Sequence, residues 1–257
     1  MEGHKVVTAE EMVRVERGLD PEAAMAKAGR HVAEAAMQFI ESHHLPKRVT
    51  LLVGKGNNGG DAYAAGLWLL DEGFSVTAWA IDAKGSPLNQ KFREKYRKQR
   101  GRFAEGVDGL IIDGLLGTGF KGKVDKKVAA LIQTANASGL PILAVDLPSG
   151  LNGTTGMADV AIRATETVTL GLPKIGLFIQ EGWNYVGKLQ IADIGLSKES
   201  IAEAEAIAYL PKRLELPPIV RIRHKYQAGY VIGYAGSKEF SGSAKMAGFA
   251  ALKAGAG

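Results

Sequence analysis

The sequence contains no cysteine, only 9 prolines and few aromatic residues (7%) among its 257 residues. Without cysteine the chain forms neither disulfide bonds nor thiolate metal sites, and this composition fits a reducing compartment, so we expect a cytoplasmic location. No stretch reaches the ~18 consecutive apolar residues of a membrane span, and the first residues lack the apolar run of a signal peptide. The sequence therefore predicts no membrane association.

The excess of positive charge is small and unevenly distributed. The net charge is +5, yet residues 84–102 carry eight Lys/Arg and one Glu, and residues 211–226 carry five Lys/Arg and one Glu. The rest of the chain is therefore acidic, with a net charge of −6. A nucleic-acid-binding protein presents a continuous basic surface, so we expect no nucleic-acid partner. The basic run within 91–102 is predicted to be the solvated face of a helix.

The apolar residues follow an α/β pattern. Asp20 and Pro21 favour the start of a helix over 21–42, where apolar residues recur every three or four positions; a shorter helix is expected over 9–18. Short apolar strands are predicted at 49–53, 75–81, 109–112, 142–145, 167–170 and 188–191, with helices at 61–72, 88–99 and 125–138. This alternation predicts an α/β protein, a Rossmann-like three-layer α/β/α sandwich with a mostly parallel sheet.

Three polar, glycine-rich loops follow strands of this predicted sheet. They are GKGNNGGD (54–61), DGLLGTGFKGK (113–123) and DLPSGLNG (146–153). Ligands of open parallel sheets bind outside the carboxyl ends of the strands. Because all three loops leave strand ends on that rim, the sequence predicts one binding site built from them.

The first loop also matches a dinucleotide-binding fingerprint. Gly54, Gly56 and Gly59 have the G-x-G-x-x-G spacing, and Asp82 lies 23 residues beyond Gly59. Asn57, Asn58 and Asp61, however, place two carboxamides and a carboxylate where a pyrophosphate needs bare backbone amides. An NAD(P)-binding oxidoreductase therefore stays an alternative, although the sequence lacks a recognisable set of hydride-transfer residues.

The second and third loops resemble two catalytic motifs without matching them. The second has the spacing of a P-loop, but Val124 stands where a hydroxyl residue would hold Mg²⁺, which excludes a P-loop NTPase. Its backbone amides, with Lys121 and Lys123, can still bind phosphate. Ser149 in the third loop is flanked by leucines where a hydrolase nucleophile needs glycines. The chemistry must therefore lie elsewhere in these loops.

Oxygen-bearing side chains from the three loops suggest a cation site. Asn58, Asp113 and Ser149 are hard donors, and a single carboxylate among neutral oxygens suits a monovalent ion. Asp146, the other carboxylate of this rim, is the candidate general acid or base. Each of these residues could instead cap its own turn, because Asn, Asp and Ser commonly do so.

Five segments in order carry a family resemblance over about residues 9–210. They are GKGNNGGD, DGLLGTGFKGK, VDLPSGLNGTTG, TVTLGLPKIGL and GKLQIADIG. Together they resemble the YjeF N-terminal domain of the NAD(P)H-hydrate epimerases. The resemblance implies a substrate hydrated at C6 of the reduced nicotinamide ring, NADHX or NADPHX, whose R and S epimers are interconverted. It also implies a glycine after NNGGD, where this chain has Ala62.

The resemblance further implies the residues of the site. It places K⁺ on Asn58, Asp113 and Ser149. The substrate contacts that it implies are Asn57, Asn58, Gly59, Gly60, Asp61, Gly117, Thr118, Gly119, Phe120, Lys121, Gly122, Lys123 and Asp146. Asp146 is the residue that we expect to carry the proton during catalysis. These implied site residues lie in the three loops selected above on physical grounds. We also expect a homo-oligomer of two or more subunits.

The composition changes near residue 211, where three prolines and mixed charges indicate a linker. We therefore predict an epimerase domain over 1–213 and, over 214–257, the linker with the truncated start of a second domain. GYVIGYAG (229–236) is expected to be a strand and 244–254 a helix. This part resembles the opening of the ADP-dependent NAD(P)H-hydrate dehydratase domain, which has a ribokinase-like fold. ADP and Mg²⁺ would serve only a complete dehydratase domain, so this chain is expected to lack that activity.

A third interpretation is a non-catalytic interaction module, because the YjeF-type fold also serves as a protein-binding scaffold. Such a scaffold has no need of Asn58, Asp113, Asp146 and Ser149, all of which are present. The sequence therefore favours the epimerase.

Overall fold

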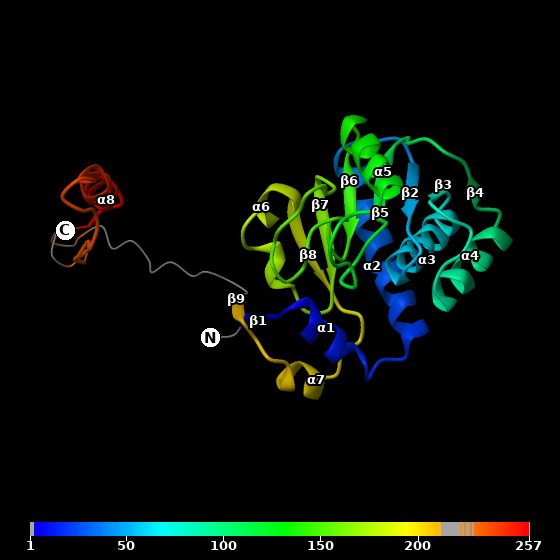
Figure 1. Cartoon of the computed structure of the whole chain (residues 1–257), viewed down its shortest axis with the longest axis horizontal. Coiled ribbons are helices and arrows are strands. Elements are labelled where there is room, and N and C mark those ends of the chain that lie inside the picture. The colour runs from blue at the N-terminus through cyan, green and yellow to red at the C-terminus, as the bar shows by residue number, and fades with distance from the viewer. Residues whose placement is uncertain (1–2, 212–221, 223, 225–226, 228, 257) are drawn as a thin grey trace. The chain divides into compact units, whose positions relative to one another are not determined.

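A seven-stranded parallel sheet forms the centre of the first part of the chain (Figure 1). The computed structural model describes residues 3–211, 222, 224, 227 and 229–256. The strands are arranged in the order β4-β3-β2-β5-β6-β7-β8, and every neighbouring pair is parallel. Their bounds are β2 Arg48–Val53, β3 Ser75–Ala80, β4 Arg102–Phe103, β5 Leu110–Gly114, β6 Ile142–Val145, β7 Glu166–Leu170 and β8 Lys188–Ala192.

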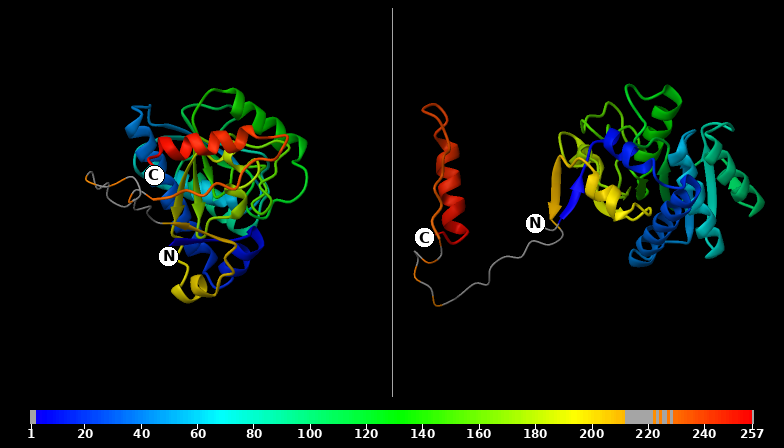
Figure 2. Two further views of the ribbon diagram at one scale, coloured as in Figure 1. Left: turned by 90° about the vertical axis from the view of Figure 1, so that its left-hand side faces the viewer. Right: turned by 90° about the horizontal axis from the view of Figure 1, so that it is seen from below.

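Helices cover both faces of the sheet, which confirms the predicted α/β/α sandwich. Alternate strand residues enter opposite cores: Leu51 packs with α2 (Pro21–Ser42), α3 (Asn57–Asp71) and α4 (Pro87–Lys98), whereas Leu52 packs with α5 (Lys126–Ala137). Figure 2 shows α2 and α5 on opposite sides of the sheet. This period of two along a strand buried on both faces explains why the strands are apolar throughout.

The helices begin where local chemistry favours it, with one exception. The Asp20 side chain accepts a hydrogen bond from the Ala23 amide (2.7 Å), which confirms the predicted start of α2. Helix α3 begins at Asn57, whereas the sequence predicted a turn as far as residue 60. A Cβ atom at Gly60 would lie 2.6 Å from the Met25 sulfur, so glycine allows this first turn to pack closely on α2.

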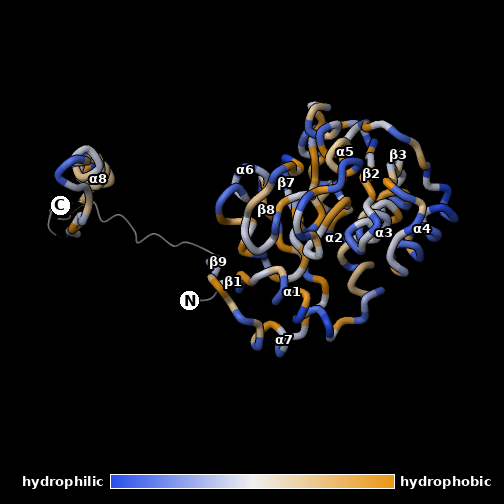
Figure 3. Tube along the Cα trace, viewed as in Figure 1, coloured by the Kyte–Doolittle hydropathy of each residue, from blue (hydrophilic) through white to orange (hydrophobic). Residues whose placement is uncertain are grey.

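The basic helix α4 is solvated as predicted. Its inner face buries Phe92 and Tyr96, and Figure 3 shows the helix as largely hydrophilic. On its outer face, Lys95 pairs with Glu22 at 2.8 Å, and the side chains of both residues are more than a third exposed. Such an exposed ion pair is typical of a solvated helix face.

A small second sheet was not predicted. Strand β1 (Gly3–Val6) pairs antiparallel with β9 (Ala208–Pro211), and Val7 then forms a parallel bridge with Lys174. This pairing fixes the short helix α1 (Ala9–Glu16), whose cap Thr8 accepts from the Glu11 amide at 3.1 Å. Three further short helices lie between β7 and β9: η1 Ile175–Leu177, α6 Gly182–Tyr185 and α7 Lys198–Glu203.

The chain divides into two units, Met1–Lys212 and Arg213–Gly257. In the second, helix α8 (Gly242–Lys253) lies close to the predicted range. The predicted strand at 229–236 was wrong, since these residues form no strand. An extended segment needs a partner strand to hold it, and none is present in the described part of this unit. The predicted linker around Pro217 and Pro218 lies outside the described residues. Within the described ranges no helix is long and apolar enough to cross a membrane.

Candidate active site

The three glycine-rich loops converge at the carboxyl rim of the sheet, and Leu116 joins them. The Leu116 amide donates to the Ser149 hydroxyl oxygen (2.8 Å), and the Asn58 side-chain amide donates to the Leu116 carbonyl (2.8 Å). A Cβ atom at Gly117 would lie 3.2 Å from the Asn58 side chain, so the second loop passes directly over the start of α3. The structure therefore brings together Asn58, Leu116 and Ser149, one residue from each loop.

Asp113 is the buried charge at the centre of this arrangement. Its side chain is fully buried at the end of β5 and accepts from the Ser149 hydroxyl (2.6 Å) and the Ser149 amide (2.8 Å). Burial raises the pKa of Asp113 to about 6, although the hydrogen bonds from Ser149 act in the opposite direction. All its partners are neutral, so a nearby cation would favour the ionised form.

The oxygens available here fit a hard monovalent cation. Asp113 supplies the charge, and the Ser149 hydroxyl and the Leu116 carbonyl supply neutral oxygens; Asn58 takes part through its side-chain nitrogen, which donates to that carbonyl. Among the residues that the structure describes, no three His, Cys, Asp or Glu side chains gather as a metal-binding group. Hard oxygen donors of this kind suit K⁺ or Na⁺ better than a transition metal.

Asp146 follows strand β6 directly and has a left-handed backbone conformation. Its φ is +67°, a region that costs a non-glycine residue about 1 kcal/mol or more. The Asp146 amide donates to the Val168 carbonyl on β7 (2.8 Å), and its carboxylate accepts from the Leu170 amide (3.2 Å). The strained turn therefore aims the carboxylate across the end of β7. Such strain is concentrated at functional sites.

Lys174 is the partner of that carboxylate, and sequence reasoning missed it. The side chain has no exposed area, and its ammonium group forms a salt bridge with Asp146. The ammonium also donates to the Leu170 carbonyl (2.8 Å) and to the Thr169 hydroxyl (3.1 Å). Lysine is almost never fully buried without such partners. The signal in the sequence was a lone lysine inside the apolar segment TVTLGLPKIGL.

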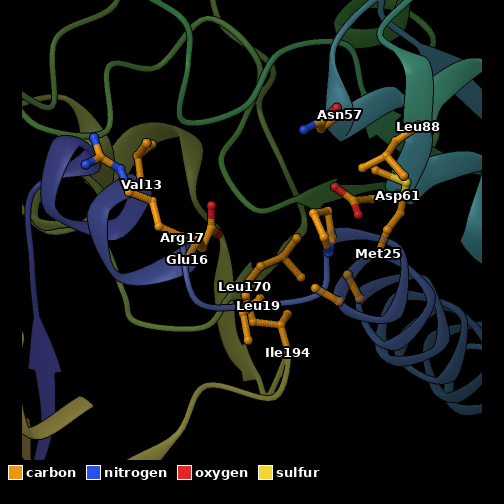
Figure 4. A pocket seen from close by; sticks show the side chains of 13 residues that line it. Val13, Glu16, Arg17, Leu19, Met25, Asn57, Asp61, Leu88, Leu170 and Ile194 are labelled. Carbon is orange, nitrogen blue, oxygen red and sulfur yellow. The ribbon is translucent and has the colours of Figure 1, made fainter. Parts of the chain in front are cut away.

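A cavity of about 250 Å³ opens beside this pair, between α1, α2 and α3 (Figure 4). Its polar side chains are Glu16, Arg17, Asn57 and Asp61. The remaining wall is apolar and comes from the helices and from the ends of β7 and β8: Val13, Leu19, Pro21, Ala24, Met25, Ala28, Leu88, Leu170 and Ile194. Asn57 and Asp61 were predicted as site residues, whereas Glu16 was not.

Two carboxyl groups of this cavity hold protons more tightly than usual. Burial raises the pKa of Asp61 well above its ordinary value, and the negative charges of Asp146 and Glu16 add to that effect. Burial likewise raises the pKa of Glu16 to about 7, again helped by Asp146, while Lys174 opposes the shift of both groups. The cavity therefore contains acids that can be protonated near neutral pH.

The loop 117–123 contacts α1 through a lysine. Lys121 pairs with Glu10 at 2.9 Å, and Glu10 also accepts from the Thr154 hydroxyl at 2.7 Å. These two hydrogen bonds, that of Thr154 first, lower the pKa of Glu10 to about 2. Lys121 is 69% exposed, so a phosphate group from solvent can reach it.

Two glycines of the first loop, Gly54 and Gly59, serve close packing. A Cβ atom at Gly54 would lie 1.8 Å from the Leu115 carbonyl oxygen, and one at Gly59 would lie 2.3 Å from the Gly54 carbonyl oxygen. Asp82, the acidic residue of the dinucleotide fingerprint, pairs with Lys55 at 3.0 Å. These contacts explain the glycines at positions 54 and 59, whereas a Cβ atom at Gly56 would meet nothing within 4 Å in the described part of the chain.

Residues 21–176 match the family model described as YjeF-related protein N-terminus. The chain belongs to this family. It is 34% identical to the bifunctional NAD(P)H-hydrate repair enzyme Nnr of Moorella thermoacetica over 98% of this chain and 53% of that protein. It is 30% identical to the NAD(P)H-hydrate epimerase of Elusimicrobium minutum over 77% of this chain and 99% of that protein. The chain thus spans about half the length of the bifunctional relatives.

A solved structure shares the fold of this YjeF chain. The crystal structure of yeast ynu0 has a TM-score of 0.61 to it at 18% sequence identity, covering 73% of this chain and 87% of that one. At this identity the likeness concerns the arrangement of the sheet and helices. It agrees with the α/β sandwich described above.

The departure at Ala62 is accommodated in the YjeF fold. Ala62 is fully buried in α3, and it faces Gly114 at the end of β5. A Cβ atom at Gly114 would lie 2.6 Å from the Ala62 methyl carbon, so the absence of a side chain at Gly114 leaves room for that methyl group. The Asn58 carbonyl oxygen, 2.8 Å from such a Cβ atom, favours glycine at position 114 as well.

Proposed function

We propose that this YjeF-family chain is an NAD(P)H-hydrate epimerase, which interconverts the R and S forms of NADHX and NADPHX. The observation that carries the proposal is the relative from Elusimicrobium minutum, which bears that name and aligns along 99% of its length. The site supports it, because a buried Asp146–Lys174 pair and two further acids lie beside the rim loops. Epimerisation at a hydroxyl-bearing carbon needs groups that deliver and remove protons.

The substrate's phosphates are proposed to bind the loop 117–123. The backbone amides of this glycine-rich loop, with Lys121 and Lys123, supply the donors and positive charge that phosphates need. Lys121 would exchange its pairing with Glu10 for a phosphate oxygen. The predicted contacts at Asn57–Asp61 then lie on the side of the loop where Gly117 meets Asn58.

K⁺ is proposed to bind Asn58, Asp113 and Ser149. When bound, it would neutralise the buried Asp113 carboxylate and hold the three loops in one arrangement. The hydrogen bonds that already link Asp113, Ser149 and Leu116 place their oxygens together, which supports this assignment.

Asp146 is proposed to carry the proton, with Lys174 as its positioning residue. The left-handed turn at Asp146 and the three hydrogen bonds of the Lys174 ammonium fix the carboxylate in one orientation. A fixed acid–base group at the reacting carbon contributes about 10²–10⁴-fold to a rate.

The direct test is to supply one epimer of NADHX and follow the appearance of the other by chromatography, with and without K⁺. We expect equilibration by the wild-type chain, and a rate lower by ~10²–10⁴-fold in Asp146→Asn with KM nearly unchanged. If the wild-type chain interconverts the epimers no faster than the uncatalysed reaction does, the proposed epimerase function is wrong. If Asp146→Asn instead keeps the rate and loses affinity, Asp146 binds substrate and another group carries the proton.

Residues 214–257 are proposed to correspond to the start of a dehydratase domain. The alignment with the bifunctional enzyme of Moorella thermoacetica covers 98% of this chain, which supports that assignment. ADP-dependent conversion of the S epimer to NADH by this chain would contradict the expectation that it lacks this activity.

A further inference from the structure

The cavity between α1, α2 and α3 holds two carboxyl groups, Glu16 and Asp61, to which the proposed mechanism assigns no proton transfer. We propose that the hydrated nicotinamide ring of the substrate sits in this cavity, between Glu16 and Asp61, and that Glu16 exchanges a proton with the hydroxyl at C6. The inference rests on the proposed function, because it names the place and a further acid–base group of that reaction. Asp146 does not line the cavity, so its proton would reach the ring by way of Glu16, whose pKa it already raises.

The lining of the cavity fits an uncharged ring. Most of its wall is apolar, and of its four polar side chains two are carboxyl groups and one, Arg17, is a cation. At about 250 Å³ it is smaller than the ~300–1,000 Å³ of pockets that enclose whole drug-sized ligands. A single ring therefore fits it better than a dinucleotide does. The phosphates are left to the loop that carries Lys121 and Lys123.

The two acids come from different elements and face each other. Glu16 lies at the end of α1, Asp61 lies in the first half of α3, and Figure 4 shows both carboxyl groups pointing into the cavity from opposite sides. A planar ring between them would present one face to each. Such an arrangement suits the inversion of a carbon whose hydroxyl must leave one face and return on the other.

The reaction balances without an oxidant or reductant. One carboxylic acid gives its proton to the C6 hydroxyl, the C6–O bond breaks, and the electron pair leaves with water while the N1 lone pair forms an N1=C6 double bond. A water molecule then adds to C6 from the opposite face, its electron pair forms the new C6–O bond, and the N1=C6 pair returns to N1. The carboxylate on that face takes the proton that the added water releases. The product is the other epimer.

The charges around Glu16 allow it to act as acid or base near neutral pH. The groups that face it are Asp61 from α3, Asp146 after β6, Lys174 after β7 and the neighbouring Arg17, which lines the same cavity. Burial and the charge of Asp146 raise the pKa of Glu16 to about 7. Both protonation states of Glu16 are therefore populated at that pH, as an exchange of protons in both directions requires.

The test compares Glu16→Gln with the wild-type chain and with Glu94→Gln, a control at an exposed residue of α4 that pairs with Arg97. Each protein is given one epimer of NADHX, and kcat and KM for its conversion are measured from pH 5 to 9. We expect Glu16→Gln to lose about 10²-fold or more in kcat, with KM nearly unchanged and without the wild-type titration near pH 7. The control should retain the wild-type profile.

The outcomes separate this inference from the function on which it rests. A wild-type chain that does not equilibrate the epimers overturns the proposed function. An active wild-type chain whose Glu16→Gln variant keeps kcat and the pH profile overturns the role of Glu16 alone. Thermal unfolding of each variant verifies that it is folded. Hydrated reduced nicotinamide mononucleotide, which keeps the ring and lacks the adenosine half, should show the same fold-loss in Glu16→Gln. A loss seen only with NADHX would place the ring outside the cavity.

Discussion

Replacing Glu16 by glutamine should stabilise the protein above neutral pH and leave it unchanged in acid. The pKa of Glu16 is raised from 4.5 to about 7, mainly by burial and then by the charge of Asp146. The folded chain therefore holds this proton more tightly than the unfolded chain. The contribution of Glu16 to the free energy of unfolding is largest below about pH 4.5. It falls as the pH rises toward 7 and stays at the lower level above that.

The magnitude follows from that difference in pKa. Raising the pKa from 4.5 to about 7 means that the wild type loses about 3 kcal/mol of unfolding free energy between pH 4.5 and pH 8. Glutamine carries no charge, so the Glu16→Gln variant does not lose it. At roughly 2–4 °C per kcal/mol for a chain of this size, the melting temperature of Glu16→Gln should exceed that of the wild type by about 6–12 °C. Within residues 3–211 no hydrogen bond to the Glu16 carboxyl would be lost.

The assay is thermal or urea unfolding of both proteins at several pH values between 4.5 and 8. All other carboxyl groups are shared, so the difference between the two curves comes from Glu16 and from the loss of its charge, a charge that also raises the pKa of Asp61 in the wild type. Glu94→Gln should differ from the wild type by no more than ~0.5 kcal/mol at any pH, as expected for an exposed residue. A loss of stability in Glu16→Gln at pH 8, or a difference that does not change with pH, would refute the reasoning.

Four further predictions concern buried polar groups and the assembly. Lys174→Met should destabilise the fold by about 3–5 kcal/mol in urea unfolding, because Asp146 would remain buried without its ion partner; Lys188→Met, at a 71% exposed residue, should have little effect. Tyr63→Phe should leave stability unchanged or raise it, because the buried Tyr63 hydroxyl has no partner in the described part of the chain. Tyr96→Phe should lower stability by ~1 kcal/mol, because it removes the hydrogen bond to the Val76 carbonyl. Asp113→Asn should abolish any dependence of activity on K⁺, and the same chromatographic assay measures it. Light scattering should give the mass of a dimer or a larger homo-oligomer.

The sequence by itself determined the parts of the protein that local patterns control. Asp20 and Pro21 mark the start of α2 because a cap and a fixed φ act within one turn of the helix. The apolar strands predicted a parallel sheet covered on both faces, and the rule that ligands bind at the carboxyl ends placed Asp113, Asp146 and Ser149 on one rim. All three of these predictions depend on neighbours in the chain or on the direction of the strands.

Only the tertiary structure decided which other groups face that rim. Lys174 lies 28 residues from Asp146, and the bond between them depends on the left-handed turn at Asp146 and on the bridge from Val7. Glu16 enters the cavity because β1 pairs with β9, about 200 residues away, and so fixes α1 beside the sheet. A charged residue in a sequence is normally solvated. The burial of Glu16 and Asp61, and with it the raised pKa of each, comes from segments that are distant in sequence. No local sequence pattern predicts it.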